Sequence, residues 1–326
     1  MEAQKYCLMD YLEEGGQAQI FKGRNQETGE IVAIKRPTDF LGIYINKEKK
    51  VLRKIKALGS DNYNIVKFYG NFFYGRKQCL VFEKLDIDLN RFVKDIVGEG
   101  LHLSDIRVIA QQVLVALNFL HSNGMAHRDL KPNNIMLVDR SSLKVKLIDM
   151  GFAEEIKKIK NFRCKPLCYL APEEILLMKL DASVDMWCLA LTLIFLYTGD
   201  RLFVYSSPEE TIAAIVKMLG EPHWSYDCPP DFKKKFRSYD PKLKLKSLDD
   251  LLKIRPPTQD PIEREDLLRF IDLLKQMLVT TPQERITPAA ALKHSFITMD
   301  HLPIAYAFEE LFATLAERCE IDVRNV

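Results

Sequence analysis

The octapeptide HRDLKPNN at residues 127–134 places acidic, basic and amide side chains on one segment, and Pro132 prevents that segment from being a regular helix. Charged groups inside a protein are costly unless they are paired or put to use. Asp129 can orient a hydroxyl group and accept its proton, Lys131 can neutralise a phosphate in transit, and Asn134 can offer an oxygen to magnesium. These residue types at this spacing predict phosphoryl transfer from ATP.

A second acid follows where another magnesium ligand is needed. The run KVKLIDMG at 144–151 is typical of a strand that ends in Asp149, after which Gly151 turns the chain. The tripeptide APE follows at 171–173. A chance cluster of solvated charges is the alternative explanation, but it does not account for all three motifs in this order.

The elements around these motifs change character near residue 88. Residues 6–35 alternate apolar and polar side chains across two turns and predict three antiparallel strands, and residues 64–85 predict two more. Apolar spacing in residues 46–58 predicts a helix between them. Later helices are predicted near 104–124, 183–198, 208–219, 263–278 and 288–294, and the proline-rich stretch 221–262 predicts an irregular insertion.

The composition is that of an ordinary globular protein, with 47% hydrophobic and 28% charged residues in 326. A net charge of +2 argues against a nucleic-acid binder that depends on bulk charge. The longest apolar run, at 189–197, is too short to span a bilayer and predicts a buried helix. Seven dispersed cysteines and no signal-peptide pattern predict reduced thiols, and Cys164 with Cys168 lacks the further ligands of a zinc site.

VAIK ending at Lys35, HRDLKPNN, DMG and APE together resemble the motifs of the protein kinase family, and the resemblance covers about residues 6–300. It implies an α+β, two-lobed kinase fold. A five-stranded β N-lobe with one main helix would occupy residues 1–85. A larger, mainly helical C-lobe would occupy 86–300, including the insertion at 221–262, and a C-terminal tail 301–326 would complete one kinase domain.

The same resemblance implies the site residues. Lys35 would hold the α- and β-phosphates of ATP with Glu48 as its ion-pair partner, and Mg²⁺ would be bound by Asn134 and Asp149. The catalytic set is Lys35, Glu48, Asp129 and Lys131. The nucleotide-binding set is Leu12, Gly15, Gly16, Ile20, Ala33, Lys35, Phe82, Glu83, Leu85 and Met136.

Further family positions have structural roles. Glu173 would pair with Arg285, and Asp185 and Trp187 would lie on a helix that supports the catalytic loop. Lys131 in that loop is typical of serine/threonine kinases rather than tyrosine kinases.

Within the family, stretches such as CLVFEKLDIDLNRFV and VDMWCLALTLIFLYTGDRLF resemble the homeodomain-interacting protein kinases of the CMGC group. That resemblance implies a monomer in the nucleus or cytoplasm that phosphorylates protein substrates, transcriptional regulators among them. It implies no direct binding of nucleic acid or membrane.

The phosphate loop departs from the family pattern G-x-G-x-x-G. The aligned residues are Glu13, Gly15 and Ala18, and Gly16 adds flexibility. Glu13 would lie near the nucleotide, so weakened ATP affinity is expected. A pseudokinase that binds partners and competes with active relatives is therefore the alternative function.

The DFG motif of the family is DMG here. Met150 is apolar and flexible, so it would fill the slot of phenylalanine beside Leu52, Phe68 and His127.

The activation segment, between Asp149 and Glu173, also departs from the pattern. It contains no Ser or Thr, Arg163 stands where the family has an autophosphorylated tyrosine, and Tyr169 is expected to be structural. The segment carries several cations, which predict either a solvated charge run, the preferred interpretation, or a preference for acidic substrates. They are Lys157, Lys158, Lys160, Arg163 and Lys165.

Arg128 would in many kinases receive a phosphate from this segment. A buried arginine needs an anion, and the nearest acids in sequence are Glu154 and Glu155. One of them is predicted to pair with Arg128, so that activity needs no phosphorylation of the activation segment.

Overall fold

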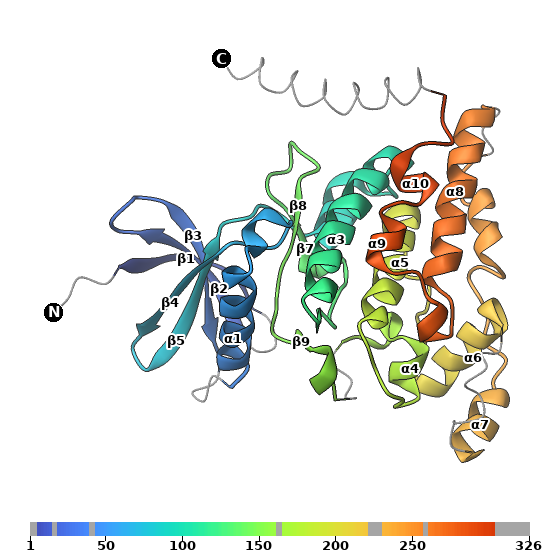
Figure 1. Cartoon of the computed structure of the whole chain (residues 1–326), viewed down its shortest axis with the longest axis horizontal. Helices are drawn as coiled ribbons and strands as arrows, with labels where there is room; N and C mark the ends of the chain where they lie inside the picture. Colours follow the sequence, from blue (N-terminus) through green and yellow to red (C-terminus); the bar gives the residue numbers. More distant parts are fainter. Residues whose placement is uncertain are drawn as a thin grey trace.

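The N-terminal part of the protein is a five-stranded antiparallel sheet in the order β1-β2-β3-β5-β4 with one helix against it (Figure 1). The structure is a computed structural model that describes residues 5–14, 18–38, 43–160, 165–220, 230–256 and 260–303. The strands are β1 (Tyr6–Glu14), β2 (Ala18–Asn25), β3 (Ile31–Pro37), β4 (Phe68–Tyr74) and β5 (Lys77–Glu83), and α1 (Ile43–Ala57) is the helix.

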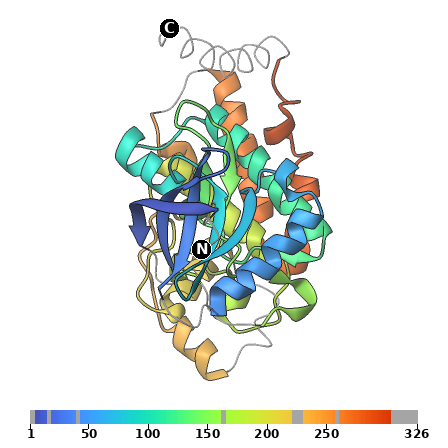
Figure 2. The same cartoon turned by 90° about the vertical axis from the view of Figure 1, so that its left-hand side faces the viewer.

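Alternation along the strands puts apolar side chains on both faces of this sheet. Ile34 and Val81 pack in a small cluster on one face, whereas Leu80 and Phe82 belong to the main core together with Leu52 of α1. Seen from the sheet side, the sheet and α1 lie in front of the helical part (Figure 2). The predicted strands and helix are thus confirmed.

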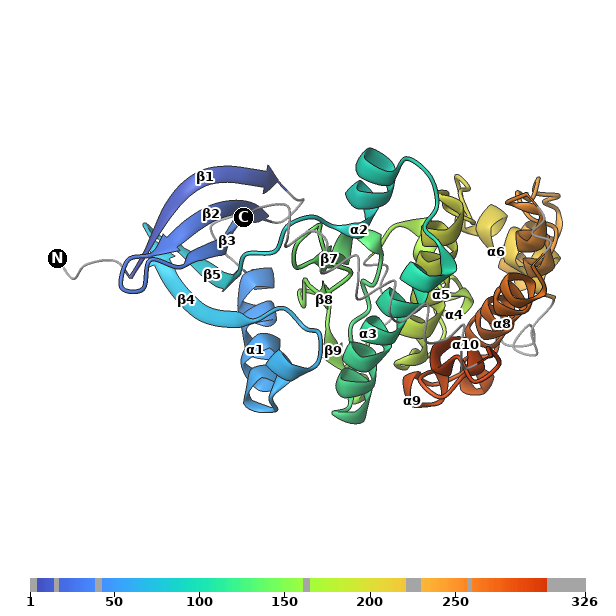
Figure 3. The same cartoon turned by 90° about the horizontal axis from the view of Figure 1, so that it is seen from above.

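The C-terminal part is mainly helical and is built around α5 (Ser183–Thr198), in which every residue from 184 to 197 is buried. Helix α3 (Leu103–Ser122) packs against α5, α8, α9 and α10 (Figure 3). The other helices are α2 (Leu89–Arg91), α4 (Pro172–Ile175), α6 (Pro208–Leu219), α7 (Pro230–Arg237), α8 (Pro261–Met277), α9 (Pro288–Ala291) and α10 (Ser295–Thr298), and a π-helical turn, Phe92–Val97, follows α2.

Helix α3 is long and apolar enough to cross a membrane by length and composition alone, among the helices in the described ranges. Its apolar window is 56% buried against other helices, which is the environment of a core helix. The apolar run at 189–197 lies in α5 and is buried, as predicted.

The insertion is less irregular than predicted. Residues 230–237 form α7, and Leu248–Lys253 forms a 3₁₀ turn, with residues 221–229 and 257–259 outside the described ranges. In α7, Phe232 and Phe236 lie four residues apart on one face, and Phe236 is buried in the core. The surrounding prolines and lysines masked this short amphipathic pattern. In place of the single helix predicted at 288–294, the structure has a short helix, α9, that ends at Ala291 and a second one, α10, that begins after His294.

Two pairs of short strands bring the sequence motifs together. β6 (Met125–Ala126) pairs with β9 (Glu154–Glu155), and β7 (Ile135–Leu137) pairs with β8 (Val145–Leu147). The HRDLKPNN loop runs from β6 to β7, and the DMG turn runs from β8 to β9. Antiparallel pairing at both ends therefore holds the two motifs side by side.

The predicted Glu173–Arg285 pair is confirmed and lies deep in the helical part. The guanidinium group makes two parallel bonds to the carboxylate, at 2.8 and 3.1 Å, and both side chains are at most 1% exposed. Arg285 also donates to the carbonyl oxygens of Ser183 and Val279 and lies over the ring of Trp187. The pair thus joins the APE segment to the start of α5.

Arg285→Gln should lower the free energy of unfolding by about 3–5 kcal/mol, because it leaves the Glu173 carboxylate buried without its cation. Urea denaturation followed by tryptophan fluorescence measures this. Arg269→Gln is the matched control, since its pair with Glu265 is exposed and should contribute about 0.5 kcal/mol or less. Similar losses in the two variants would contradict the structural role of the buried pair.

Candidate active site

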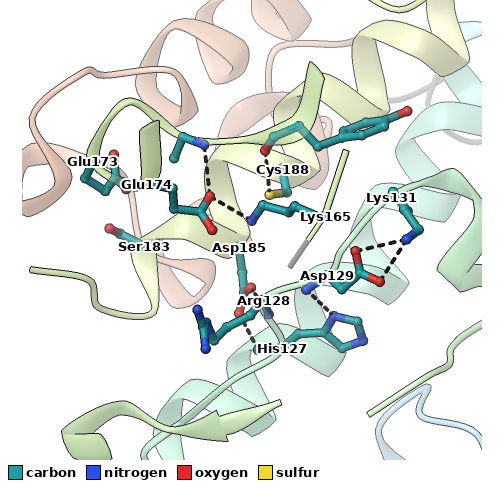
Figure 4. A network of polar contacts seen from close by, with 12 residues as sticks. His127, Arg128, Asp129, Lys131, Lys165, Glu173, Glu174, Ser183, Asp185 and Cys188 are labelled. Atoms are coloured by element: carbon teal, nitrogen blue, oxygen red, sulfur yellow. Dashed lines mark hydrogen bonds and ion pairs between the residues drawn. The ribbon is translucent and has the colours of Figure 1, made fainter. Parts of the chain in front are cut away.

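The catalytic loop is anchored by one buried carboxylate from α5. Asp185 accepts hydrogen bonds from the backbone N–H groups of His127 and Arg128, both at 2.8 Å (Figure 4). It also lies 2.9 Å from Nε2 of His121. Burial would raise the pKa of Asp185, but His121 and these N–H groups outweigh burial and lower it to about 2. The bonds hold Arg128 at a φ of 70°, a left-handed conformation that is strained for a residue with a side chain. The predicted supporting role of Asp185 is confirmed.

Asp129 lies at the centre of a compact polar group in this loop. Its carboxylate accepts from Lys131 Nζ at 3.0 and 2.8 Å and from Asn134 Nδ2 at 2.9 Å. Asn134 also donates to the Asp129 carbonyl oxygen at 2.7 Å. The carboxylate is therefore fixed in orientation with a cation beside it, which is the arrangement expected of a group that positions a hydroxyl nucleophile.

The second group comes from three distant segments. Lys35 Nζ lies 2.9–3.0 Å from the Glu48 carboxylate and 2.8 Å from Oδ1 of Asp149. β3 supplies Lys35, α1 supplies Glu48, and the turn after β8 supplies Asp149. The lysine therefore links the sheet, its helix and the catalytic turn, as the predicted Lys35–Glu48 pair required.

Burial and charge oppose each other in this triad. Burial raises the pKa of Glu48 to about 7, because it outweighs the attraction of Lys35. Burial alone would lower the pKa of Lys35, yet Asp149 and Glu48 raise it above its ordinary value. Burial would raise the pKa of Asp149, but Lys35 lowers it to about 2. Lys35 is therefore a largely buried cation that lies at nearly the same distance from the Glu48 and Asp149 carboxyl groups.

Two oxygen atoms remain for a metal ion in this arrangement. The Asn134 amide uses its nitrogen for Asp129, and Asp149 uses Oδ1 for Lys35 and the Gly151 N–H, which leaves Asn134 Oδ1 and Asp149 Oδ2. The Ile148 N–H donates to the Asn134 carbonyl at 2.9 Å, so the residues that bear these oxygens are neighbours. A magnesium ion takes few protein ligands and completes its shell with water and phosphate oxygens. The donor set fits such an ion.

The predicted adenine-binding residues lie along the junction between the sheet and the helical part. Ala33 faces Phe82 across β3 and β5, and Met136 of β7 bridges to Asp88 on the opposite side. Leu85 is buried, and no partner accepts from its backbone N–H within the described residues. That N–H fits an acceptor nitrogen of a purine base.

The other residues predicted to contact the nucleotide differ in their exposure and in their partners. Ile20 is half-buried in β2, whereas Leu12 is 41% exposed in β1. The Glu83 carboxylate bonds to Lys146 Nζ at 2.6 and 2.7 Å, which links the end of β5 to β8. Gly15 and Gly16 lie outside the described residues.

Glu13 is not an isolated negative charge. Its carboxylate lies 3.1 Å from a guanidinium nitrogen of Arg91 in α2, so an ion pair connects the end of β1 to the helical part. Both side chains are about half exposed, at 50% and 49%. Sequence reasoning considered Glu13 alone and expected repulsion of the nucleotide; Arg91, 78 positions away by residue number, offsets that charge. The expected weakening of ATP affinity stays a prediction.

Met150 is fully buried in the main core cluster, which also contains Leu52 and Phe68. It therefore occupies an apolar slot, as predicted.

The predicted partner of Arg128 is present. Arg128 Nη1 donates to Oε2 of Glu154 at 3.0 Å, and Nη2 donates to the Lys160 carbonyl oxygen at 3.0 Å. Glu155 instead pairs with Lys54 and Lys158. The activation segment is thus tied to the catalytic loop by a carboxylate of its own. Arg163 and Cys164 lie outside the described residues.

Lys165 is not part of a solvated charge run. Its side chain is fully buried and lies 2.8 Å from Oε2 of Glu174, which also accepts from the Ala171 N–H at 2.9 Å (Figure 4). Cys188 of α5 donates to the carbonyl oxygen of Tyr169 next to this pair. Sequence reasoning missed this ion pair; the acid that follows Glu173 in APEE was its only signal.

Comparison with known proteins agrees with this geometry. The family model of the protein kinase domain matches residues 6–297, and the chain belongs to the protein kinase family. It is 32% identical to homeodomain-interacting protein kinase 2 of Mesocricetus auratus over 91% of this chain and 29% of the relative. It is 33% identical to homeodomain-interacting protein kinase 1 of Mus musculus over 91% of this chain and 28% of the relative. It is also 32% identical to serine/threonine-protein kinase ppk15 of Schizosaccharomyces pombe, over 91% of this chain and 62% of the relative.

The chain spans less than a third of the length of the homeodomain-interacting kinases that it matches first. The resemblance seen in the sequence, both to protein kinases and to that branch, is confirmed by these similarities.

The Glu48→Gln variant should gain stability relative to the parent as pH rises. Folded Glu48 keeps its proton up to about pH 7, whereas the unfolded carboxyl loses it near 4.5. Because the folded state then binds more protons, the parent's free energy of unfolding falls as pH rises between these values. Glutamine does not titrate, so the variant lacks this fall. Lys35 and Asp149 do not change the pH dependence of the free energy of unfolding between these pH values. The pKa of each group lies outside that range in the folded state and in the unfolded state.

Urea denaturation of parent and variant near pH 5 and near pH 8 (roughly the ends of this window) measures the difference. Glu265→Gln, on the surface of α8, controls for removal of a carboxylate. A difference between parent and Glu48→Gln that stays constant with pH would show that Glu48 titrates normally.

Proposed function

We propose that this chain is an ATP-dependent serine/threonine protein kinase. The observation that carries the proposal is the juxtaposition of two polar groups, Asp129 with Lys131 and Asn134, and Lys35 with Glu48 and Asp149, through the β6–β9 and β7–β8 pairs. Phosphoryl transfer needs little covalent chemistry from a protein; it needs positioning and charge stabilisation, which these groups supply.

Each residue has a specific task in this proposal. Asp129 orients the serine or threonine hydroxyl and accepts its proton, and Lys131 balances charge on the transferred group. Lys35 binds the nucleotide phosphates and is held by Glu48. Asn134 and Asp149 would hold Mg²⁺, which supplies positive charge between the phosphates.

The non-catalytic alternative has little support. The six residues just named are all present, and their side chains form the contacts described above within the site. Glu13 forms an ion pair with Arg91. The proposal also includes protein substrates, transcriptional regulators among them, and a nuclear or cytoplasmic location. It rests for these points on similarity to kinases whose names describe interaction with homeodomain proteins.

Asp129→Asn should retain the fold and Mg-ATP binding but lower phosphate transfer by about 10²–10⁴-fold, because an amide cannot accept the hydroxyl proton. Asp149→Ala should instead weaken Mg-dependent ATP binding, since a metal ligand is lost. Calorimetry with Mg-ATP and a radiolabel assay on a generic protein substrate separate the two effects. Transfer by Asp129→Asn at the parent rate would reject Asp129 as the base.

Protein made in bacteria and treated with phosphatase should keep its activity, because Glu154 already provides the anion for Arg128. Glu154→Gln should reduce kcat by roughly tenfold, since the loss of a charge-assisted bond to a buried arginine loosens the activation segment. Glu155→Gln is the matched control, because Glu155 pairs with Lys54 and Lys158 at the surface. A large loss of activity on phosphatase treatment would contradict the mechanism.

A further inference from the structure

A shallow cationic groove lies beside the segment that leads into APE. It encloses about 330 Å³ between the π-helical turn after α2 and the loop after α5. We call this pocket the cationic groove; the residues that line it include Lys94, Phe195, Asp200, Arg201, Val204 and Lys244. Three cations thus surround one carboxylate.

The single acid in the cationic groove does not satisfy these cations. Asp200 lies 3.5 Å from Lys94 Nζ and 3.7 Å from Lys244 Nζ, near the outer limit of an ion pair, and its side chain is 66% exposed. Arg201 is exposed, and no carboxylate within the described ranges forms an ion pair with it. The groove therefore has a net positive charge that solvent alone balances.

The position of the cationic groove relates it to the active site. Burial raises the pKa of the Cys168 thiol, and Arg201 and Lys131 both oppose that rise through their charges. The π-helical turn that carries Lys94 directly follows α2, and α2 contacts residues 132–134 of the catalytic loop. The turn Leu167–Tyr169 of the activation segment contacts α5, whose C-terminal end carries the other wall of the groove. The groove is thus connected to the catalytic loop and to the activation segment through elements in direct contact with them.

The groove also offers apolar surface. Val204 is 60% exposed at its wall, and Lys94 lies over the ring of Phe195. A ligand with carboxylates and some apolar side chains matches this wall better than a small inorganic anion does, because it uses both the charge and the exposed valine.

We propose that the cationic groove binds acidic residues of protein substrates and gives this kinase a preference for serine or threonine in an acidic sequence. The inference rests on the proposed function for its biological meaning. Its physical content, binding of an acidic peptide at Lys94, Arg201 and Lys244, is independent of catalysis.

Two peptides of equal length, each with one serine, test the inference. One carries glutamate and aspartate around the serine, and the other carries glutamine and asparagine at the same positions. The parent should show a lower KM for the acidic peptide, by roughly tenfold, with similar kcat. Fluorescence anisotropy with the labelled peptides measures binding directly, and the preference should weaken with added salt.

Variants locate the binding site. Lys94→Gln and Lys244→Gln should each reduce the preference for the acidic peptide about two- to fivefold, as expected for one partly exposed charge, and Arg201→Lys should retain most of it. Asp200→Asn should strengthen the preference, because it removes the competing carboxylate. Lys275→Gln is the matched control: its side chain is 49% exposed, against 50% and 52% for Lys94 and Lys244, and it pairs with Asp249 elsewhere. Thermal unfolding checks that each variant is folded.

The outcomes separate the two proposals. If the parent phosphorylates neither peptide, the proposed function fails, and anisotropy still decides the groove. If the parent phosphorylates both peptides but binds them equally, the inference is overturned while the kinase assignment stands. Acidic-peptide binding that Lys94→Gln, Lys244→Gln and Lys275→Gln affect alike would also overturn it, since the charge effect would then be general. Equal displacement of the peptide by an equal concentration of inorganic phosphate would show a simple anion site instead.

Discussion

A single carboxylate, that of Asp185, determines the geometry on which the rest of this molecule depends. It accepts two successive backbone N–H groups, from His127 and Arg128, and it is fully buried in α5, in which every residue from 184 to 197 is buried. Because α5 is packed on all sides, the carboxylate is held in one position, and its bonds fix the backbone of the loop at His127 and Arg128. The left-handed conformation of Arg128 is stabilised by these bonds, and it sets the direction from which Asp129 enters the site.

The sheet and the helical part share one apolar core, and an ion-pair group at Lys35 also joins them. Lys35 contacts Glu48 of α1 and Asp149 in the turn after β8. The positions of α1 and of this turn therefore depend on each other. Asp149 also has a left-handed backbone, with a φ of 59°. Two strained residues, Arg128 and Asp149, thus flank the candidate site, and both are held by partners on other elements.

Sequence reasoning predicted the parts of this arrangement that have strong local signals. The motif residues, the five strands and the long helices each carry a pattern within a few residues, and the pairing of Glu173 with Arg285 followed from family resemblance. A partner for Arg128 among Glu154 and Glu155 was predicted from physical need, since a buried cation requires an anion, and the structure shows that the partner is Glu154.

Contacts between distant segments were the part that the sequence did not reveal. Lys165 looks like one lysine among several in a basic stretch, and only packing against α5 places it in the interior with Glu174. Glu13 lies at the end of β1 and Arg91 in α2, and the sequence offers no local signal that these two elements meet. Helix α7 is short, and its apolar residues are too few to stand out among prolines and lysines. In each case the decisive fact is a neighbour in space with no counterpart in local pattern.

The Glu13–Arg91 pair makes one contact between the two parts of the molecule dependent on ionic strength. It joins the rim of the sheet to the first helix beyond β5, and water reaches both partners. An interaction of this kind is attenuated by dissolved ions over a screening length of about 8 Å at physiological ionic strength. A buried apolar contact in its place would not be weakened by such screening. The strength of this one link between the edge of the sheet and the helical part therefore falls as the ionic strength rises.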